Sequence, residues 1–317
     1  MALASQPIPL SPHRTARLPA LLEWWHLLSL DAPCVAALWA WGFAGALHLD
    51  LPADSLLLLF AGTWLLYIAD RVLDGFHQSP ARLRERHFFC MRHRVAILLT
   101  AVPIAVLLAW LVFAHMLPAA RSADTLIFSV ACAYFCLVHL PRRALRHAVE
   151  RWLPKELIVA LVFASATAVP AFARITGTVS GATLRSPQTQ AVLPALAVLF
   201  AALCWLNCIA IEKWEQAPPP AGPAQSGQSR TAPETNDLTT RWGQRHLRLI
   251  SASIASVAVL AAALLLHSSP AAAGLCFAAA IAAALFIALE HSTLSVPHLR
   301  IAADAVLLTP LLLFLLR

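Results

Sequence analysis

The chain has 317 residues, of which 60% are hydrophobic and 12% are charged, and its mean hydropathy is +0.71. Soluble domains contain about 25% charged residues, so this composition excludes an ordinary soluble protein and indicates a polytopic membrane protein. Six of the seven cysteines lie within apolar runs, which predicts small buried thiols and no disulfide framework.

Residues 1–28 are predicted to form a mobile tail followed by an interfacial segment. The segment carries Trp24 and Trp25, whose amphipathic rings favour the membrane–water interface. It also contains Glu23 and has no clean cleavage pattern, so it does not resemble a signal peptide.

Residues 29–317 contain nine apolar stretches, each near the roughly 20 residues that span a bilayer. Backbone polar groups in lipid must be satisfied within their own segment, so the stretches predict helices and an all-α transmembrane domain. A Pro-, Gly- and Ser-containing insert at about 217–238 is predicted to be disordered. The expected helices are 29–48, 53–74, 95–117, 123–140, 156–174, 190–212, 247–267, 271–290 and 298–316.

The distribution of Lys and Arg predicts how these helices are oriented. With nine spans, 19 of the 23 basic residues fall on the side of the N-terminus and four on the other. Basic loops stay in the cytoplasm, so the N-terminus is expected there, in a multi-pass protein of the inner (plasma) membrane. Topology therefore accounts for the net charge of +7, and nucleic-acid binding is not expected.

Polar residues gather on the basic side, at the ends of predicted helices. Asp70, Arg71 and Asp74 end the second helix, and the spacing of four places both carboxylates on one helix face. This motif either marks where the helix leaves the bilayer or forms part of a functional site. Two further clusters lie at the start of the fifth helix and the end of the sixth: Lys155 with Glu156, and Asn207 with Glu212 and Glu215.

Two acidic groups with basic residues nearby suit the binding of a diphosphate. Mg²⁺ prefers oxygen ligands and commonly binds through one or two carboxylates together with substrate phosphates. A lysine or arginine would neutralise the remaining charge as diphosphate leaves. An apolar cavity between the helices would hold a hydrocarbon chain.

These motifs resemble those of the UbiA-type intramembrane prenyltransferases. That family has nine transmembrane helices and two acidic motifs, Asn-Asp-x-x-Asp-x-x-x-Asp on helix 2 and Asp-x-x-x-Asp on helix 6. Asp70-Arg71-Val-Leu-Asp74 is similar to the second half of the first motif, and Glu212-Lys-Trp-Glu215 occupies the place of the second. Trp152-Leu-Pro-Lys155 is loosely similar to the family's Tyr-Pro-x-x-Lys segment.

The resemblance implies transfer of a prenyl group from a prenyl diphosphate to an acceptor in the membrane. It assigns Mg²⁺ to Asp70, Asp74, Glu212 and Glu215, and diphosphate contacts to Arg71 and Lys155; Asn207 is a candidate polar ligand deeper in its helix. Catalysis is assigned to Asp70, Asp74 and Lys155. The acceptor, the prenyl chain length and the oligomeric state are open.

The chain departs from the family pattern, and two alternatives remain. Leu66 and Tyr67 stand where the first motif has Asn-Asp, and Gln216 stands where the second motif ends in Asp. One alternative is therefore a family-shaped protein that binds an isoprenoid, lipid or partner protein without catalysis. The other is a small transporter using Asp70, Asp74 and Asp304, which is disfavoured because transporter sites lie near the midplane.

Other polar residues allow simpler interpretations. His87, Cys90 and His93 have the spacing of a short metal motif, but the arginines among them favour a basic loop at the headgroups or a lid over the diphosphate. Asp304, within the ninth helix, is expected to pair with a polar group or to line the cavity. Asp31 and Glu290 are expected at the membrane interface.

Overall fold

The computed structural model describes residues 20–77, 84–116, 118–139, 154–177, 187–216 and 238–315, and every regular element in these ranges is helical. The tail before residue 20 and the insert between residues 217 and 237 lie outside the described residues. The long helices are α2 (Asp31–Ala46), α3 (Ala53–His77), α5 (Arg94–Ala114), α6 (Pro118–His139), α8 (Lys155–Gly177), α9 (Pro187–Gln216), α11 (Leu247–Leu265) and α12 (Pro270–Glu290).

Shorter helices connect and flank the long ones. They are α1 (Ala20–Leu27), α4 (Glu85–Arg92), α10 (Leu238–Arg245), α13 (Val296–Val306) and α14 (Leu312–Leu315), with the 3₁₀ helix η2 (Thr309–Leu311) between the last two. The ninth expected helix is thus broken into three pieces. α13 ends at Val306, four residues before Pro310, which has no backbone N–H to bond to the Val306 carbonyl oxygen in a continuous helix.

The protein is a polytopic helical membrane protein. Within the described ranges, six helices are long and apolar enough to cross a membrane, or seven if α1 and α2, bent by 90° at residues 28–30, form one broken span. Each of the nine expected segments coincides with helix, but a count of nine membrane-spanning helices stays a prediction.

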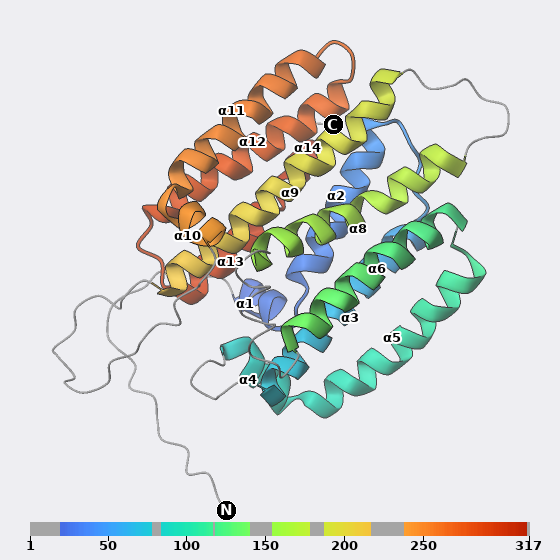
Figure 1. Cartoon of the computed structure of the whole chain (residues 1–317), viewed down its shortest axis with the longest axis vertical. Helices are drawn as coiled ribbons and strands as arrows, with labels where there is room; N and C mark the ends of the chain where they lie inside the picture. Colours follow the sequence, from blue (N-terminus) through green and yellow to red (C-terminus); the bar gives the residue numbers. More distant parts are fainter. Residues whose placement is uncertain are drawn as a thin grey trace, which may run out of the picture.

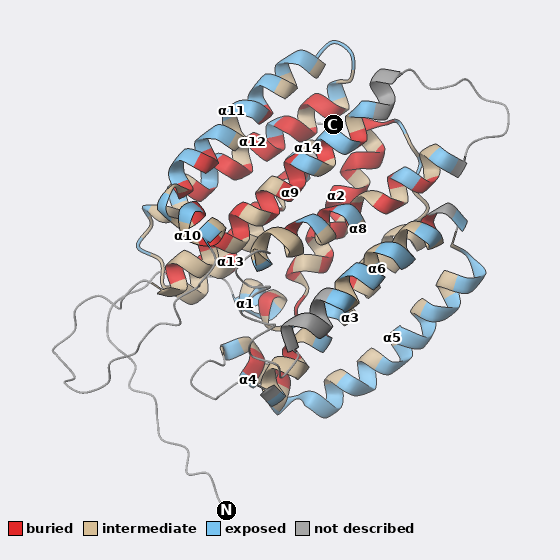
Figure 2. Cartoon of the chain, viewed as in Figure 1, coloured by how far each residue is buried: buried red, intermediate tan, exposed pale blue. Residues whose placement is uncertain are grey.

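The core lies where α2, α9 and α12 pack together, and these helices carry most of the buried residues in Figure 2. Trp39 stacks on Phe200 with ring centroids 4.4 Å apart, and both side chains are fully buried. The Trp39 indole N–H donates to the carbonyl oxygen of Leu307 at 2.9 Å, which satisfies its polar group inside the apolar core.

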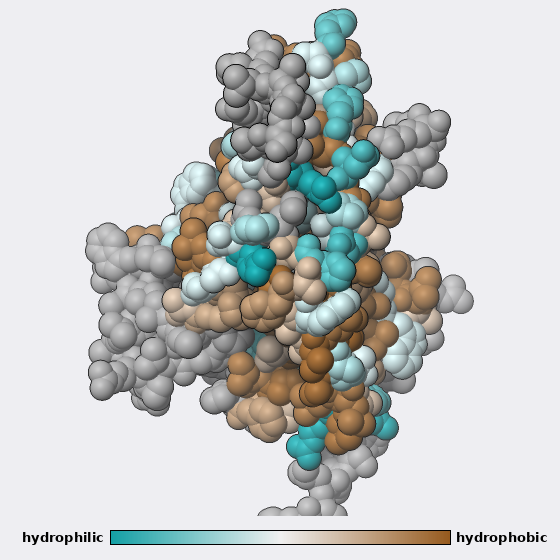
Figure 3. Space-filling model, turned by 90° about the vertical axis from the view of Figure 1, so that its right-hand side faces the viewer, coloured by the Kyte–Doolittle hydropathy of each residue, from teal (hydrophilic) through white to brown (hydrophobic). Residues whose placement is uncertain are grey.

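The outer helices present apolar side chains to their surroundings. No residue of α5 is buried, and Leu99 and Phe113 are more than 70% exposed. Figure 3 shows further large apolar areas on the side of the molecule that it presents. In a soluble protein such a surface would aggregate, whereas lipid chains are as apolar as these residues and solvate them.

The short helices α1, α4, α10 and α13 lie toward one end of the bundle (Figure 1). This end carries the basic residues Arg84, Arg86, Arg241, Arg245 and Arg300, which belong to the basic side in the sequence. Arg121 and Arg174, expected on the opposite side, occur at other helix ends, and Arg174 lines one small pocket there with His115 and Asp54. Basic residues that the sequence places on opposite sides therefore lie at different helix ends.

Candidate functional site

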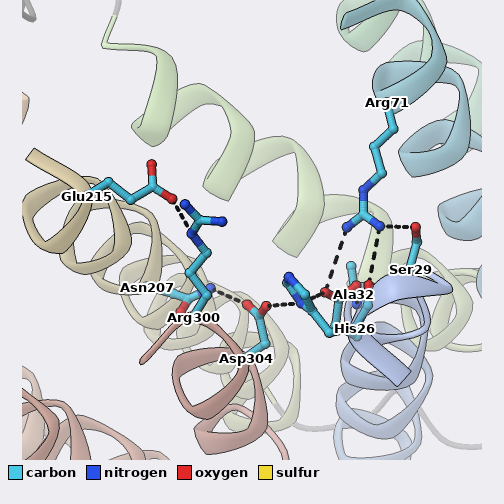
Figure 4. A network of polar contacts seen from close by, with 9 residues as sticks. His26, Ser29, Ala32, Arg71, Asn207, Glu215, Arg300 and Asp304 are labelled. Carbon is cyan, nitrogen blue, oxygen red and sulfur yellow. Dashed lines mark hydrogen bonds and ion pairs between the residues drawn. The ribbon is translucent and has the colours of Figure 1, made fainter. Parts of the chain in front are cut away.

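A network of buried polar side chains lies at the basic end, between α1, α2, α3, α9 and α13 (Figure 4). Arg71 is its central cation and is only 2% exposed. Its Nη1 group donates to the Ser29 hydroxyl and, at 3.3 Å, to the backbone carbonyl oxygen of His26. Its Nη2 lies 3.9 Å from Asp31 Oδ2. Arg71 therefore ties the end of α3 to the junction of α1 and α2.

Two carboxylates and an imidazole meet beside Arg71. His26 Nδ1 lies 2.9 Å from Asp31 Oδ2 and 3.6 Å from Asp304 Oδ2. Asn207 Nδ2 donates to the other Asp304 oxygen at 3.0 Å. Asp31, expected at the membrane interface, is instead 2% exposed and packed within the protein. Asp304 was expected either to pair with a polar group or to line the cavity, and it does pair with polar groups of the bundle.

Glu215, at the end of α9, forms ion pairs with two arginines. One carboxylate oxygen pairs with Arg84, just before α4, and the other pairs with Arg300 of α13. Burial lowers the pKa of Arg84 to about 10, while the negative charge of Glu215 raises it. Metal binding by both oxygens of Glu215 would require these arginines to move.

The segment from Arg84 to His87 connects the two acidic motifs. The Arg84 backbone N–H donates to His87 Nδ1 at 3.2 Å, so the ring proton is assigned to Nε2. That nitrogen lies 3.5 Å from Asp74 Oδ2 on α3. Because Arg84 also pairs with Glu215, one short stretch of chain contacts the ends of both α3 and α9.

Residues at the start of α8 lie near the same part of α9. The charges of Lys155 and Glu156 act on the Cys208 side chain, as do those of Glu212 and Asp304. Lys155 is exposed, and Glu156 accepts a hydrogen bond from the Thr240 hydroxyl at 2.7 Å. The lysine is thus at the basic end, near the polar face of α9.

The expected site residues occupy different parts of this end. Asp74 faces α4, Arg71 faces α1 and α2, and Asn207 faces α13. Asp70 is half-buried on α3, and Glu212 accepts from Gln216 at 3.1 Å within α9.

His26, Ser29 and Arg300 were not predicted from the sequence as site residues. No motif spacing marks them, since they come from distant segments; the sequence signal for Asp31 and Asp304 was a charge inside an apolar stretch.

The short motif His87-x₂-Cys90-x₂-His93 does not form a metal cluster in the part of the chain that the structure describes. His87 faces Asp74, whereas His93 Nδ1 lies 3.0 Å from the carbonyl oxygen of Phe89 in its own helix. Burial raises the pKa of the Cys90 thiol, which keeps it protonated. The segment expected as a loop instead forms helix α4, in which His87 and Cys90 are buried.

The donor chemistry of the acidic motifs fits Mg²⁺, because Asp70, Asp74, Glu212 and Glu215 offer only oxygen ligands. In the described ranges, these four carboxylates do not form a compact group of three ligand atoms. Mg²⁺ often keeps one or two protein carboxylates and takes its other ligands from phosphates and water.

Fold and site together define a helical membrane protein with a buried ion network and an arginine-rich surface at one end. No family model, curated protein or solved structure matches the chain.

Proposed function

We propose that this protein is a Mg²⁺-dependent enzyme of the UbiA type, with nine transmembrane helices, that transfers a prenyl group from a prenyl diphosphate to an acceptor within the membrane. The observation that carries the proposal is the connection of the two acidic motifs through Arg84 and His87. Asp74 and Glu215 belong to helices that are far apart in the sequence, yet both contact this short segment. A diphosphate at the basic end would meet carboxylates and arginines together.

Each group has a defined task in this proposal. When bound, Mg²⁺ supplies positive charge between the carboxylates and the diphosphate. Asp70, Asp74 and Glu212 are the carboxylates that would hold it. Glu215 would join them if Mg²⁺ replaced one of its two arginine partners. Arg84 and Lys155 would stabilise the negative charge on the departing diphosphate. The apolar helices would keep water from the allylic carbon.

The test is release of pyrophosphate from an allylic diphosphate by the purified protein in lipid nanodiscs. Activity should require Mg²⁺, and Asp70→Asn and Asp74→Asn should lower kcat by at least 100-fold. Asp54→Asn is the matched control, because Asp54 lies in the first turn of the same helix, at the opposite end. Full activity in the Asp70 and Asp74 variants would refute the proposal.

A specific observation favours one alternative, a protein that binds an isoprenoid without reacting with it. Glu215 already has two arginine partners, so one carboxylate of the second motif is engaged without metal. The alternative predicts that a radiolabelled prenyl diphosphate binds equally well with and without EDTA and is recovered intact. If the protein is a Mg²⁺-dependent enzyme, the prenyl diphosphate should bind more weakly in EDTA.

A further inference from the structure

Outside the two acidic motifs, His26, Asp31 and Asp304 present one ligand atom each to a common point. The three atoms lie within 4.8 Å of one another, and the residues come from α1, α2 and α13. His26 is 7% exposed and Asp31 2%, so water is largely excluded from around them. Figure 4 shows the imidazole of His26 facing the carboxylate of Asp304, and Asp31 Oδ2 lies 2.9 Å from the same ring nitrogen.

The distances between these atoms suit a bound transition metal. A tetrahedral ion with bonds of 2.0–2.2 Å separates its ligand atoms by about 3.3–3.6 Å. His26 Nδ1 lies 2.9 Å from the Asp31 oxygen and 3.6 Å from the Asp304 oxygen, values that bracket this separation. Small side-chain adjustments would be enough to admit an ion.

The chain bends sharply to place His26 and Asp31 together. The axes of α1 and α2 meet at 90°, and Ser29 at the bend has a φ of 61°, in the left-handed region. A non-glycine residue rarely adopts this conformation, and it tends to occur where the surroundings enforce it, often at functional sites. Arg71 contributes to this by donating to the Ser29 hydroxyl.

Each carboxylate is held in place by a further residue. Arg71 Nη2 lies 3.9 Å from Asp31, and the Ala32 backbone N–H donates to the second Asp31 oxygen at 2.9 Å. Asn207 donates to Asp304. Metal-ligating carboxylates are characteristically fixed by such hydrogen bonds, so the surroundings resemble those of a binding site.

A second, independent observation concerns Asn207. Its side chain is 9% exposed, and its Oδ1 atom has no hydrogen-bond partner among the residues that the structure describes. A buried polar atom without a partner is unusual, and an ordered water or a ligand commonly satisfies such an atom. This oxygen belongs to the amide group that already contacts the carboxylate.

An approach to the cluster exists from the basic end. A cavity of about 280 Å³ is lined by His26, Arg86, Ser295, His298 and Arg300 among others. His26 thus contacts both the carboxylates and the cavity. An ion with three protein ligands keeps a position for water or substrate, and of the three proposed ligands His26 is the one that lines the cavity.

We propose that His26, Asp31 and Asp304 bind one divalent transition-metal ion, with Zn²⁺ as the preferred occupant. One imidazole and two carboxylates suit a borderline ion, whereas Mg²⁺ favours oxygen ligands alone. On binding, the His26 Nδ1 lone pair coordinates the ion and the ring proton resides on Nε2. The two carboxylates balance the ion's charge, and Arg71 and Asn207 act as positioning residues. This site is separate from the acidic motifs proposed to bind Mg²⁺ with diphosphate.

The experiment uses full-length protein in detergent, stripped with a chelator and titrated with Zn²⁺ by calorimetry. One ion per chain is expected, and His26→Ala and Asp304→Asn should weaken binding by at least 100-fold. Asn207→Ala should weaken it by about 10–100-fold, the usual effect of losing a residue that orients a ligand. Asp54→Asn and Asp74→Asn should bind like the wild type, which separates this site from the proposed Mg²⁺ chemistry.

A spectroscopic measurement on the wild-type protein tests the proposal even if the variants fail to fold. Co²⁺-substituted wild-type protein should show d–d absorption without a thiolate charge-transfer band, because no cysteine is a ligand. A thiolate band would assign the ion to Cys90 or another thiol and overturn the proposal. So would the absence of stoichiometric binding by the wild type, or unchanged binding by a folded His26→Ala variant.

Discussion

Asn207 on α9 donates a hydrogen bond to Asp304 on α13, across 3.0 Å and 97 residues of sequence. It pairs a neutral amide with a carboxylate inside an apolar bundle, where the Asn207 residue is 9% exposed and the Asp304 side chain 16%. Hydrogen bonds to charged groups contribute about 1.5–3 kcal/mol, and an unsatisfied buried partner costs a similar amount. The pair is therefore expected to fix how α13 docks on α9.

Asn207→Leu should lower the free energy of unfolding by about 1–3 kcal/mol, because Asp304 loses a donor while remaining buried. Adding Asp304→Leu should recover part of this loss, since both polar groups are then absent. Chelator-treated protein in detergent would be followed by thermal unfolding. If the double variant is as unstable as the sum of the two single ones, the residues do not act as a pair.

Glu215→Gln should destabilise the protein by about 1–3 kcal/mol, because Arg84 and Arg300 both lose their counter-charge. Most of the effect should come from Arg300, whose side chain is 13% exposed, since the Arg84 side chain is 35% exposed and better screened.

Glu23→Gln is the control for this variant. The Glu23 side chain is 48% exposed and lies 3.7 Å from His298, so its loss should cost less than about 0.5 kcal/mol. Unfolding of both variants would be compared in the same detergent. Equal effects would show that the buried pairs on Glu215 contribute no more than a surface pair.

Ser29→Gly should be less harmful than Ser29→Ala. Both variants remove the hydroxyl that accepts from Arg71, but glycine adopts a φ of 61° without steric cost, whereas alanine keeps the strain. The difference between the two is expected to be about 1 kcal/mol in thermal unfolding. Greater stability of the alanine variant would mean that the bend at Ser29 is not strained in solution.

The orientation in the membrane can be tested at the two ends of α12. In a variant without the seven native cysteines, Ser268→Cys should react with a membrane-impermeant maleimide in intact spheroplasts. Thr293→Cys should react only after lysis, because the distribution of basic residues places it in the cytoplasm. Ser268 and Thr293 are both exposed and flank the same helix, so each controls for the other. Labelling of Thr293→Cys in intact spheroplasts, with Ser268→Cys labelled only after lysis, would show that the topology is opposite to the predicted one.

The helical segments were predictable because hydropathy acts locally. A run of about 20 apolar residues has few alternatives to a helix in lipid, whatever its neighbours are. The apolar segment at 298–316 was the exception, since Pro310 ends its α-helical stretch. The polar ends of α3 and α9 were also recognisable, because charged residues next to apolar runs are conspicuous.

The partners of those polar residues were not predictable. Arg71 was expected to contact diphosphate together with Lys155, and its described contacts are with Ser29, His26 and Asp31. Glu215 was assigned to a metal, yet it pairs with two arginines. Both outcomes depend on how the short helices α1, α4 and α13 close the basic end.

The sequence by itself determined that the protein is a helical membrane protein and which helix ends are basic. These properties follow from the composition of short segments and from the cost of placing polar groups in lipid. Only the tertiary structure decided that His26, Asp31 and Asp304 meet, because they come from three helices and no sequence spacing links them. Convergence of this kind depends on helix packing and on one 90° bend, which are properties of the whole bundle.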